Sequence, residues 1–110
     1  MSTIHVSLDI TADPPVTCNP KHQSMNSGND AINWKPAANQ SFTFSSLTGL
    51  PNPPFTTPSV TDDEITVTDN NQAAGDYPYT LTVMLNGLPY STTASSPKGT
   101  GGGDPTIKNN

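Results

Sequence analysis

The sequence predicts an all-β protein, a single domain over residues 1–110 folded as an antiparallel two-sheet sandwich of about seven to eight strands. Two observations predict this fold class. Short segments alternate apolar and polar residues with a period of two, which places one face of each strand against a core. Between these segments lie 12 prolines and 8 glycines, which suit turns and disfavour helices.

The first strand is expected over residues 2–11, where apolar and polar residues alternate. Its core-facing side chains are expected to be Ile4, Val6, Leu8 and Ile10. Two prolines then end the strand, because proline donates no hydrogen bond to a ladder, and residues 15–18 predict a short second strand. Residues 19–30 are almost entirely polar, which predicts a loop of about a dozen residues.

Two strands and a crossover are expected in the middle of the chain. Residues 31–35 form a short strand that carries Trp34, the single tryptophan. Residues 40–47 alternate again, and their core candidates are Phe42, Phe44 and Leu47. Residues 48–58 are rich in proline, which predicts an extended crossover that takes the chain from one sheet to the other.

The C-terminal half predicts further strands. Residues 64–69 place Ile65 and Val67 on one side of a strand, and residues 69–76 form a turn of Asn, Asp and Gly. The longest strand is expected over residues 77–87. Its core-facing side chains are expected to be Tyr79, Leu81, Val83 and Leu85.

A hairpin and a tail complete the expected fold. The pair Asn86-Gly87 is a strong hairpin signal, so residues 88–93 are expected to return as the partner strand. A flexible Gly-rich segment over residues 95–104 then precedes a possible last edge strand over residues 105–110.

The segment AGDYPYTLTV, residues 74–83, carries a Gly-x-Tyr pattern at the entry to a strand. This pattern resembles the tyrosine corner of immunoglobulin-like and cupredoxin-like sandwiches. The resemblance implies an immunoglobulin-like arrangement in which the Tyr77 hydroxyl bonds to the backbone of the preceding turn. Tyr79 stands where such domains usually have a cysteine, which fits a reducing compartment. A likeness of fold alone implies no function.

The tail GDPTIKN, residues 103–109, together with the segment YPYTLTVMLNG, residues 77–87, resembles the small bacterial family called DP-EP. The resemblance implies a β-sandwich fold. It brings no catalytic residue with it, and it rests on these two segments only.

Charge and composition exclude some classes of partner. The net charge is −5, and the four basic residues are all lysines. Arginine is the usual reader of phosphate and guanine, so nucleic acid is not an expected partner. Anionic membranes are disfavoured for the same reason, and no apolar run is long enough to span a bilayer. The N-terminus shows no signal-peptide pattern, which makes a cytoplasmic location the default expectation.

The stretch CNPKHQSM poses the main chemical question. Cys18, His22 and Met25 have the spacing C-x3-H-x2-M, and His5 lies upstream. A thiolate, two imidazoles and a thioether are the ligands of blue-copper sites. Cupredoxin ligands, however, cluster near the C-terminus, and His5 is expected to point to solvent. We therefore predict a polar loop without a copper site, in which Cys18 packs as a small hydrophobe.

The sequence offers two other candidate sites, a catalytic pair and a calcium-binding turn. Cys18 and His22 form a loose nucleophile-and-base pair, but no orienting group or oxyanion pocket is visible, so no catalytic residue is predicted. Asp69, Asn70 and Asp76, with Asn71 between them, lie in one turn that offers oxygen ligands for calcium. Turn capping by the same side chains is the favoured reading.

The residues favour a non-catalytic binding or assembly module without a cofactor, and a small metal protein is the alternative. Lysine, which often guards sheet edges, is scarce in this chain. The segments 2–11 and 105–110 are expected to be the edge strands. Weak homo-oligomerisation through these edges is therefore expected, and binding to another protein through loops is the other possibility.

Overall fold

The structure is a computed structural model, and all regular elements in the residues that it describes are β-strands. The described residues are 2–12, 14–25, 29–71, 73–93 and 105–109. The prediction of an all-β protein is confirmed, although the described residues form eleven short strands, more than the sequence suggested. The Gly-rich segment predicted over residues 95–104 lies outside the described residues.

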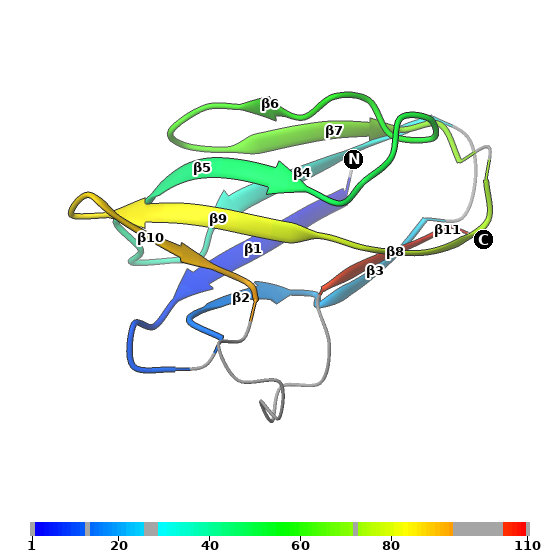
Figure 1. The fold of residues 1–110 in the computed structure, drawn as a ribbon. Helices are drawn as coiled ribbons and strands as arrows, with labels where there is room; N and C mark the ends of the chain where they lie inside the picture. The colour runs from blue at the N-terminus through cyan, green and yellow to red at the C-terminus, as the bar shows by residue number, and fades with distance from the viewer. Residues whose placement is uncertain (1, 13, 26–28, 72, 94–104, 110) are drawn as a thin grey trace.

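The strands form three sheets. The largest has the order β2 (Val16–Asn19), β1 (Ser2–Leu8), β4 (Asp30–Pro36), β7 (Ile65–Asp69) and β6 (Ser59–Val60). The second has the order β10 (Leu88–Ser91), β9 (Thr80–Leu85) and β5 (Thr43–Thr48). The third has the order β3 (His22–Met25), β11 (Thr106–Asn109) and β8 (Gly75–Pro78). The first two sheets form the layers of a sandwich, and the third lies at one end (Figure 1).

The expectation of a purely antiparallel fold is wrong at two places. Strands β1 and β4 pair in parallel, as do β3 and β11. The chain leaves β1, passes through β2 and β3, and enters β4 in its original direction. A period of two reports which face of a strand is buried, but it carries no information on strand direction.

The polar segment predicted as a loop over residues 19–30 contains strand β3. Its burial pattern leaves only Met25 fully buried, so its sequence shows no buried face. Its backbone pairs with β11, which comes from the other end of the chain. This partner supplies the hydrogen bonds that the local sequence does not announce.

Both segments predicted as sheet edges are interior strands. Strand β1 lies between β2 and β4, and β11 lies between β3 and β8. The segment predicted as one long strand, residues 77–87, also divides at Tyr79. Its first part, β8, pairs with β11, and its second part, β9, pairs with β5 and β10. The chain therefore changes sheets where a single alternating pattern runs without a break.

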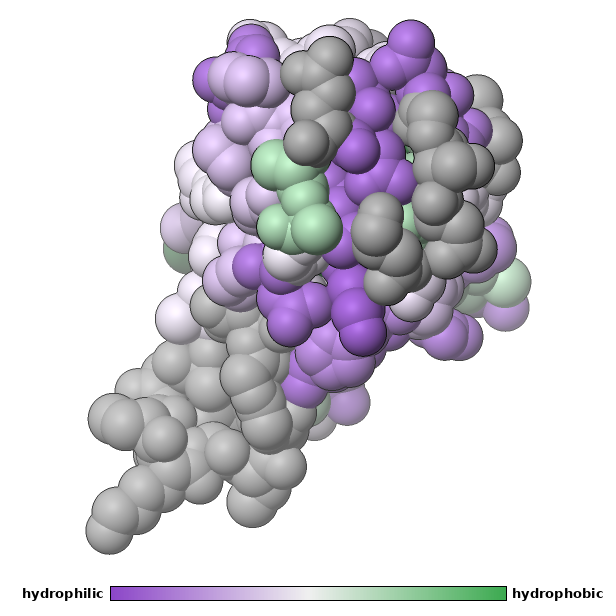
Figure 2. Space-filling view, turned by 90° about the vertical axis from the view of Figure 1, so that its right-hand side faces the viewer, coloured by the Kyte–Doolittle hydropathy of each residue, from purple (hydrophilic) through white to green (hydrophobic). Residues whose placement is uncertain are grey.

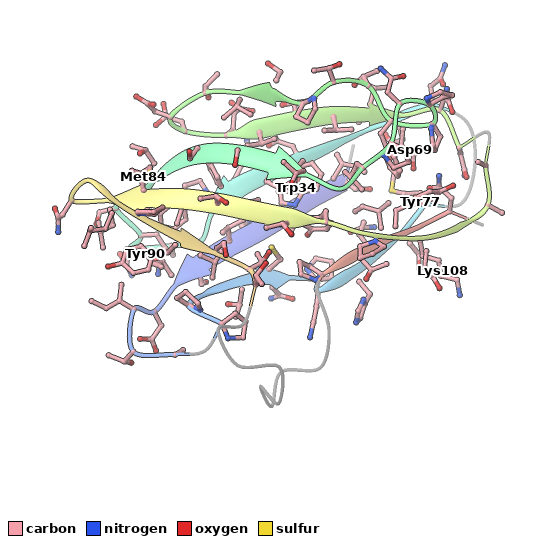
Figure 3. The ribbon with its side chains drawn as sticks, in the orientation of Figure 1. Trp34, Asp69, Tyr77, Met84, Tyr90 and Lys108 are labelled. Atoms are coloured by element: carbon pink, nitrogen blue, oxygen red, sulfur yellow. The ribbon has the colours of Figure 1, made fainter. Side chains whose placement is uncertain are left out.

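The core follows the predicted alternation closely. Trp34 is fully buried at its centre, and its indole Nε1 donates a hydrogen bond of 3.1 Å to the Tyr79 hydroxyl (Figure 3). The two rings meet edge to face with their centroids 5.4 Å apart. The predicted core positions that are buried are Ile4, Val6, Phe42, Phe44, Leu47, Ile65, Val67, Tyr79, Leu81 and Val83. Burial of these side chains is the main source of stability.

Two local predictions are confirmed in detail. Asn86 and Gly87 have φ values of 53° and 79°, the left-handed conformations that a two-residue hairpin turn requires. They join β9 to β10, with Leu85 paired to Leu88. The Tyr77 hydroxyl donates a hydrogen bond of 3.0 Å to the Ala73 carbonyl, as the tyrosine-corner pattern implied.

The predicted burial of Ile10 is wrong. Strand β1 ends at Leu8, and the Ile10 side chain is 57% exposed. The Asp9 side chain accepts hydrogen bonds from the backbone N–H and the hydroxyl of Thr11, at 3.0 and 2.6 Å. This side-chain turn competes with strand continuation, so the alternation persists in sequence after the strand has ended.

Candidate functional site

Cys18, the first of the predicted ligand residues, lies on β2 with its side chain in the core. Burial raises the pKa of the Cys18 thiol to about 11, while a hydrogen bond with the Tyr79 side chain acts in the opposite direction. The nucleophile and the metal ligand in cysteine chemistry are both the thiolate. Near neutral pH Cys18 is therefore a neutral packed thiol, which is a poor nucleophile.

A small cavity of about 80 Å³ lies beside this thiol. Its lining residues are Pro14, Val16, Thr17, Cys18, Lys21, Thr92 and Pro105. A cavity of this size holds little more than a few water molecules. It does not make the neutral thiol a reactive one.

The four side chains that match the ligand types of a blue-copper site are divided between two faces. Cys18 pairs with Val6 and points inward, whereas His5 pairs with Asn19 and is exposed on the opposite face of β1. On β3, His22 is exposed and Met25 is buried. Because the two sulfur atoms face the interior and the two imidazoles face solvent, the structure does not bring the four side chains together.

The candidate calcium turn keeps Asn71 beside Asp69, whereas Asp76 lies on a separate strand. Asp69 is fully buried at the end of β7. Asp76 is exposed on β8, where its backbone lies opposite that of Lys108 in the strand register. Asn70 donates its backbone N–H to the Pro54 carbonyl. Across the described residues, no group of three or more His, Cys, Asp or Glu side chains is placed to hold a metal ion.

Two asparagines, Asn71 and Asn109, donate hydrogen bonds to the Asp69 carboxylate. The Asp69 Oδ1 atom accepts hydrogen bonds from the backbone N–H of Asn71 at 2.8 Å and from the side-chain Nδ2 of Asn109 at 3.1 Å. Asn109 lies on β11, 40 positions along the chain. Only the turn composition signalled Asn71, and nothing in the local sequence signalled Asn109. Asp69 and Tyr77 lie at the end of the sandwich that carries the third sheet (Figure 3), and the surface there is mostly hydrophilic (Figure 2).

The opposite end of the sandwich carries an open hollow of about 490 Å³. It lies between the turn after β1, the β4–β5 connection and the end of β9. Figure 1 shows these three segments on the left side of the molecule. The lining residues are Leu8, Asp9, Ile10, Asn39, Gln40, Ser41, Phe42 and Leu85. Leu88, the pairing partner of Leu85, is 57% exposed beside it.

No pattern in the sequence predicts this hollow. The available signal is an apolar residue, Ile10, directly before a Thr-Ala-Asp-Pro-Pro break, and the alternation predicts a core position there. The Thr11 hydroxyl, and then its backbone N–H, lower the pKa of Asp9, so the rim of the hollow carries a negative charge at neutral pH.

The chain matches no protein-family model and no curated protein. The part of the chain that the structure describes contains no helix with the length and apolar character needed to cross a membrane.

Proposed function

We propose that this chain is a non-catalytic binding module that holds a segment of another protein at the hollow between Ile10 and Leu85. The observation that carries the proposal is the hollow itself, which is lined by Ile10, 57% exposed, and by Leu85, whose pairing partner Leu88 is also 57% exposed. Grouped exposed apolar side chains beside a concave surface are typical of protein-binding sites.

The lining of the hollow suggests the chemistry of the partner. Leu8, Ile10, Phe42 and Leu85 offer apolar surface for one or two apolar side chains of the partner. Asp9 at the rim and the net charge of −5 favour a neutral or basic segment. The same charge and the absence of arginine argue against nucleic acid and anionic membranes as partners.

Self-association through sheet edges is the alternative form of this proposal, but the observed edges support it less. Among the described edge strands, β6 has only two residues, and β2, β3 and β8 have four each. Strand β10 carries Pro89, and β5 is interrupted by a bulge. The backbone N–H of Phe44 on β5 also bonds to the Asp62 carbonyl. Short, bulged and proline-bearing edges are poor templates for pairing. Sedimentation velocity over a concentration series separates the two forms, since only self-association depends on the concentration of this chain alone.

We infer further that the scaffold is of the immunoglobulin-like type and that the chain is a relative of the DP-EP family. The hydrogen bond between the Tyr77 hydroxyl and the Ala73 carbonyl supports the first part. The tail and hairpin motifs support the second. Neither part assigns an activity, because these scaffolds carry many unrelated functions.

The test uses peptides selected from a random display library on the immobilised chain. Binding of the selected peptides is expected to weaken at least about tenfold in Ile10→Asp and in Leu88→Asp, because a charge replaces the apolar contact. The matched control is Val60→Asp, since Val60 is also an exposed apolar residue but lies on β6, away from the hollow. Equal binding to Ile10→Asp and to the unmodified chain would contradict the proposed site.

A further inference from the structure

Three buried oxygen atoms at the Asp69 end of the sandwich have no hydrogen-bond donor. They are Asp69 Oδ2, Asn71 Oδ1 and Asn109 Oδ1, as judged over the described residues. Asp69 is 0% exposed and Asn109 is 2% exposed. Buried polar atoms nearly always have a partner, so three unpartnered acceptors in contacting residues require an explanation.

The hydrogen bonds fix which way the two amides point. Asn109 Nδ2 donates to Asp69 Oδ1 at 3.1 Å and to the Ala73 carbonyl at 3.2 Å. Asn71 Nδ2 donates to the Met25 carbonyl at 3.3 Å. Turning either amide over would place its oxygen against these acceptor oxygens. The unpartnered Oδ1 atoms are therefore a property of the packing.

The carboxylate of Asp69 adds a charge to this cluster. Its Oδ1 atom has two neutral donors and its Oδ2 atom has none. A buried anion is strongly unfavourable unless a cation neutralises it. A trapped water molecule would donate hydrogen bonds to the oxygens but would leave the charge in place.

A second carboxylate lies directly across the sheet. Asp30 on β4 is the antiparallel partner of Asp69 on β7, and directly opposed side chains point to the same face, with Cβ atoms about 5 Å apart. Asp30 is half-buried, and its Oδ2 atom lies 3.4 Å from the Ser2 hydroxyl. The N-terminal ammonium hydrogen-bonds to Asp30 and lowers the pKa of its carboxyl, so the charge of Asp30 already has a cation beside it and Asp30 is not counted as a ligand.

We propose that Asp69, Asn71 and Asn109 form a calcium-binding site. Calcium takes carboxylate, amide and carbonyl oxygens in irregular geometry, and water completes its coordination. The site lies at the opposite end of the sandwich from the proposed peptide hollow and does not depend on that proposal. It retains Asp69 and Asn71 of the candidate turn, adds Asn109, and leaves out Asn70 and Asp76. Because Asn109 is on β11, bound calcium ties the last strand to β7.

The first measurement is the melting temperature of the full chain after chelation, with and without calcium. A site with a dissociation constant near 10 µM is expected to raise the melting temperature by about 10 °C at about 1 mM calcium. Isothermal titration calorimetry with calcium chloride is expected to give one site per chain. Absence of both signals at about 10 mM calcium, or an equal temperature shift with sodium chloride at the same ionic strength, would overturn the proposal.

Variants test which residues bind the ion. Asp69→Asn keeps the shape and removes the charge, so it is expected to abolish the calcium shift without lowering the melting temperature in chelator, since a buried charge is removed. Asn71→Ala keeps the backbone N–H that holds Asp69 and removes one oxygen ligand. It is expected to weaken calcium binding at least about tenfold, and it tests the site even if Asp69→Asn does not fold.

Asp76→Asn is the matched control, because Asp76 is an exposed acid on β8, the strand that pairs with β11. It is expected to keep the full calcium shift. A shift that persists in both Asp69→Asn and Asn71→Ala would overturn the proposed ligands. A shift lost in Asp76→Asn and kept in Asp69→Asn would place calcium at the exposed turn and would also overturn them.

Discussion

The two ends of the sandwich depart from ordinary burial in opposite ways. One end exposes large apolar side chains, Ile10 and Leu88, around an open hollow. The other end buries polar side chains, Asp69 and Asn109, and leaves oxygen atoms of both without donors. Exposed apolar clusters and buried unpaired polar groups are the informative departures in a folded protein. We propose that each departure is relieved by something from outside the chain, a partner segment at one end and a cation at the other.

The largest expected effect contrasts one isoleucine from each end. Ile107 is fully buried on β11, the middle strand of the third sheet, whereas Ile10 is mostly exposed. Ile107→Ala is expected to lower the free energy of unfolding by about 2–5 kcal/mol. Ile10→Ala is expected to change it by less than about 0.5 kcal/mol. Urea unfolding measures the free energy of unfolding of both variants, provided that its dependence on urea concentration keeps the slope of the unmodified chain. Similar costs for the two variants would show that the ends do not differ in the way described.

A second prediction concerns the interior between the ends, where burial is ordinary. The pKa of Cys18 is raised from 9.0 to about 11 in the folded chain. The unfolded state therefore loses the thiol proton first as the pH rises, so the stabilisation is complete below pH 9 and is lost as the pH passes 11. We expect this thiol to account for roughly 2–3 kcal/mol of lost stability across that range.

Urea midpoints measured across the same range in the unmodified chain and in Cys18→Ala check this prediction. Tyr79, whose pKa is also raised by burial and by Cys18, contributes a loss of the same sign in both proteins. The unmodified chain should therefore lose stability more steeply than the variant. Parallel pH profiles would contradict a neutral, buried thiol.

The smallest expected effect separates two tyrosines of the same segment. The Tyr79 hydroxyl accepts the indole hydrogen bond of Trp34 in the core. The Tyr77 hydroxyl donates to the Ala73 carbonyl at the surface of the end that contains Asp69. Tyr79→Phe leaves a buried N–H unpaired and is expected to cost about 1–3 kcal/mol, against about 0.5–1 kcal/mol for Tyr77→Phe. Thermal unfolding compares them, and a larger cost for Tyr77→Phe would argue against a dry core around Trp34.

The sequence by itself determined those features that depend on near neighbours. Alternation placed Phe42, Phe44 and Leu47 in the core, because a strand presents every second side chain to the same face. The Asn86-Gly87 pair determined its hairpin, since both positions need positive φ. The contact from Tyr77 to Ala73 spans four residues and was also predictable.

Only the tertiary structure decided which strands meet and what lies between them. Strand β11 enters the sheet between β3 and β8, and Asn109 reaches Asp69 across 40 positions of the chain. A one-dimensional pattern records which face of a segment is buried, but it does not record the partner, its direction or the order of strands. The polar cluster at Asp69 depends on such pairings. For this reason the core and the local turns were predictable from sequence, whereas the cluster at Asp69 was not.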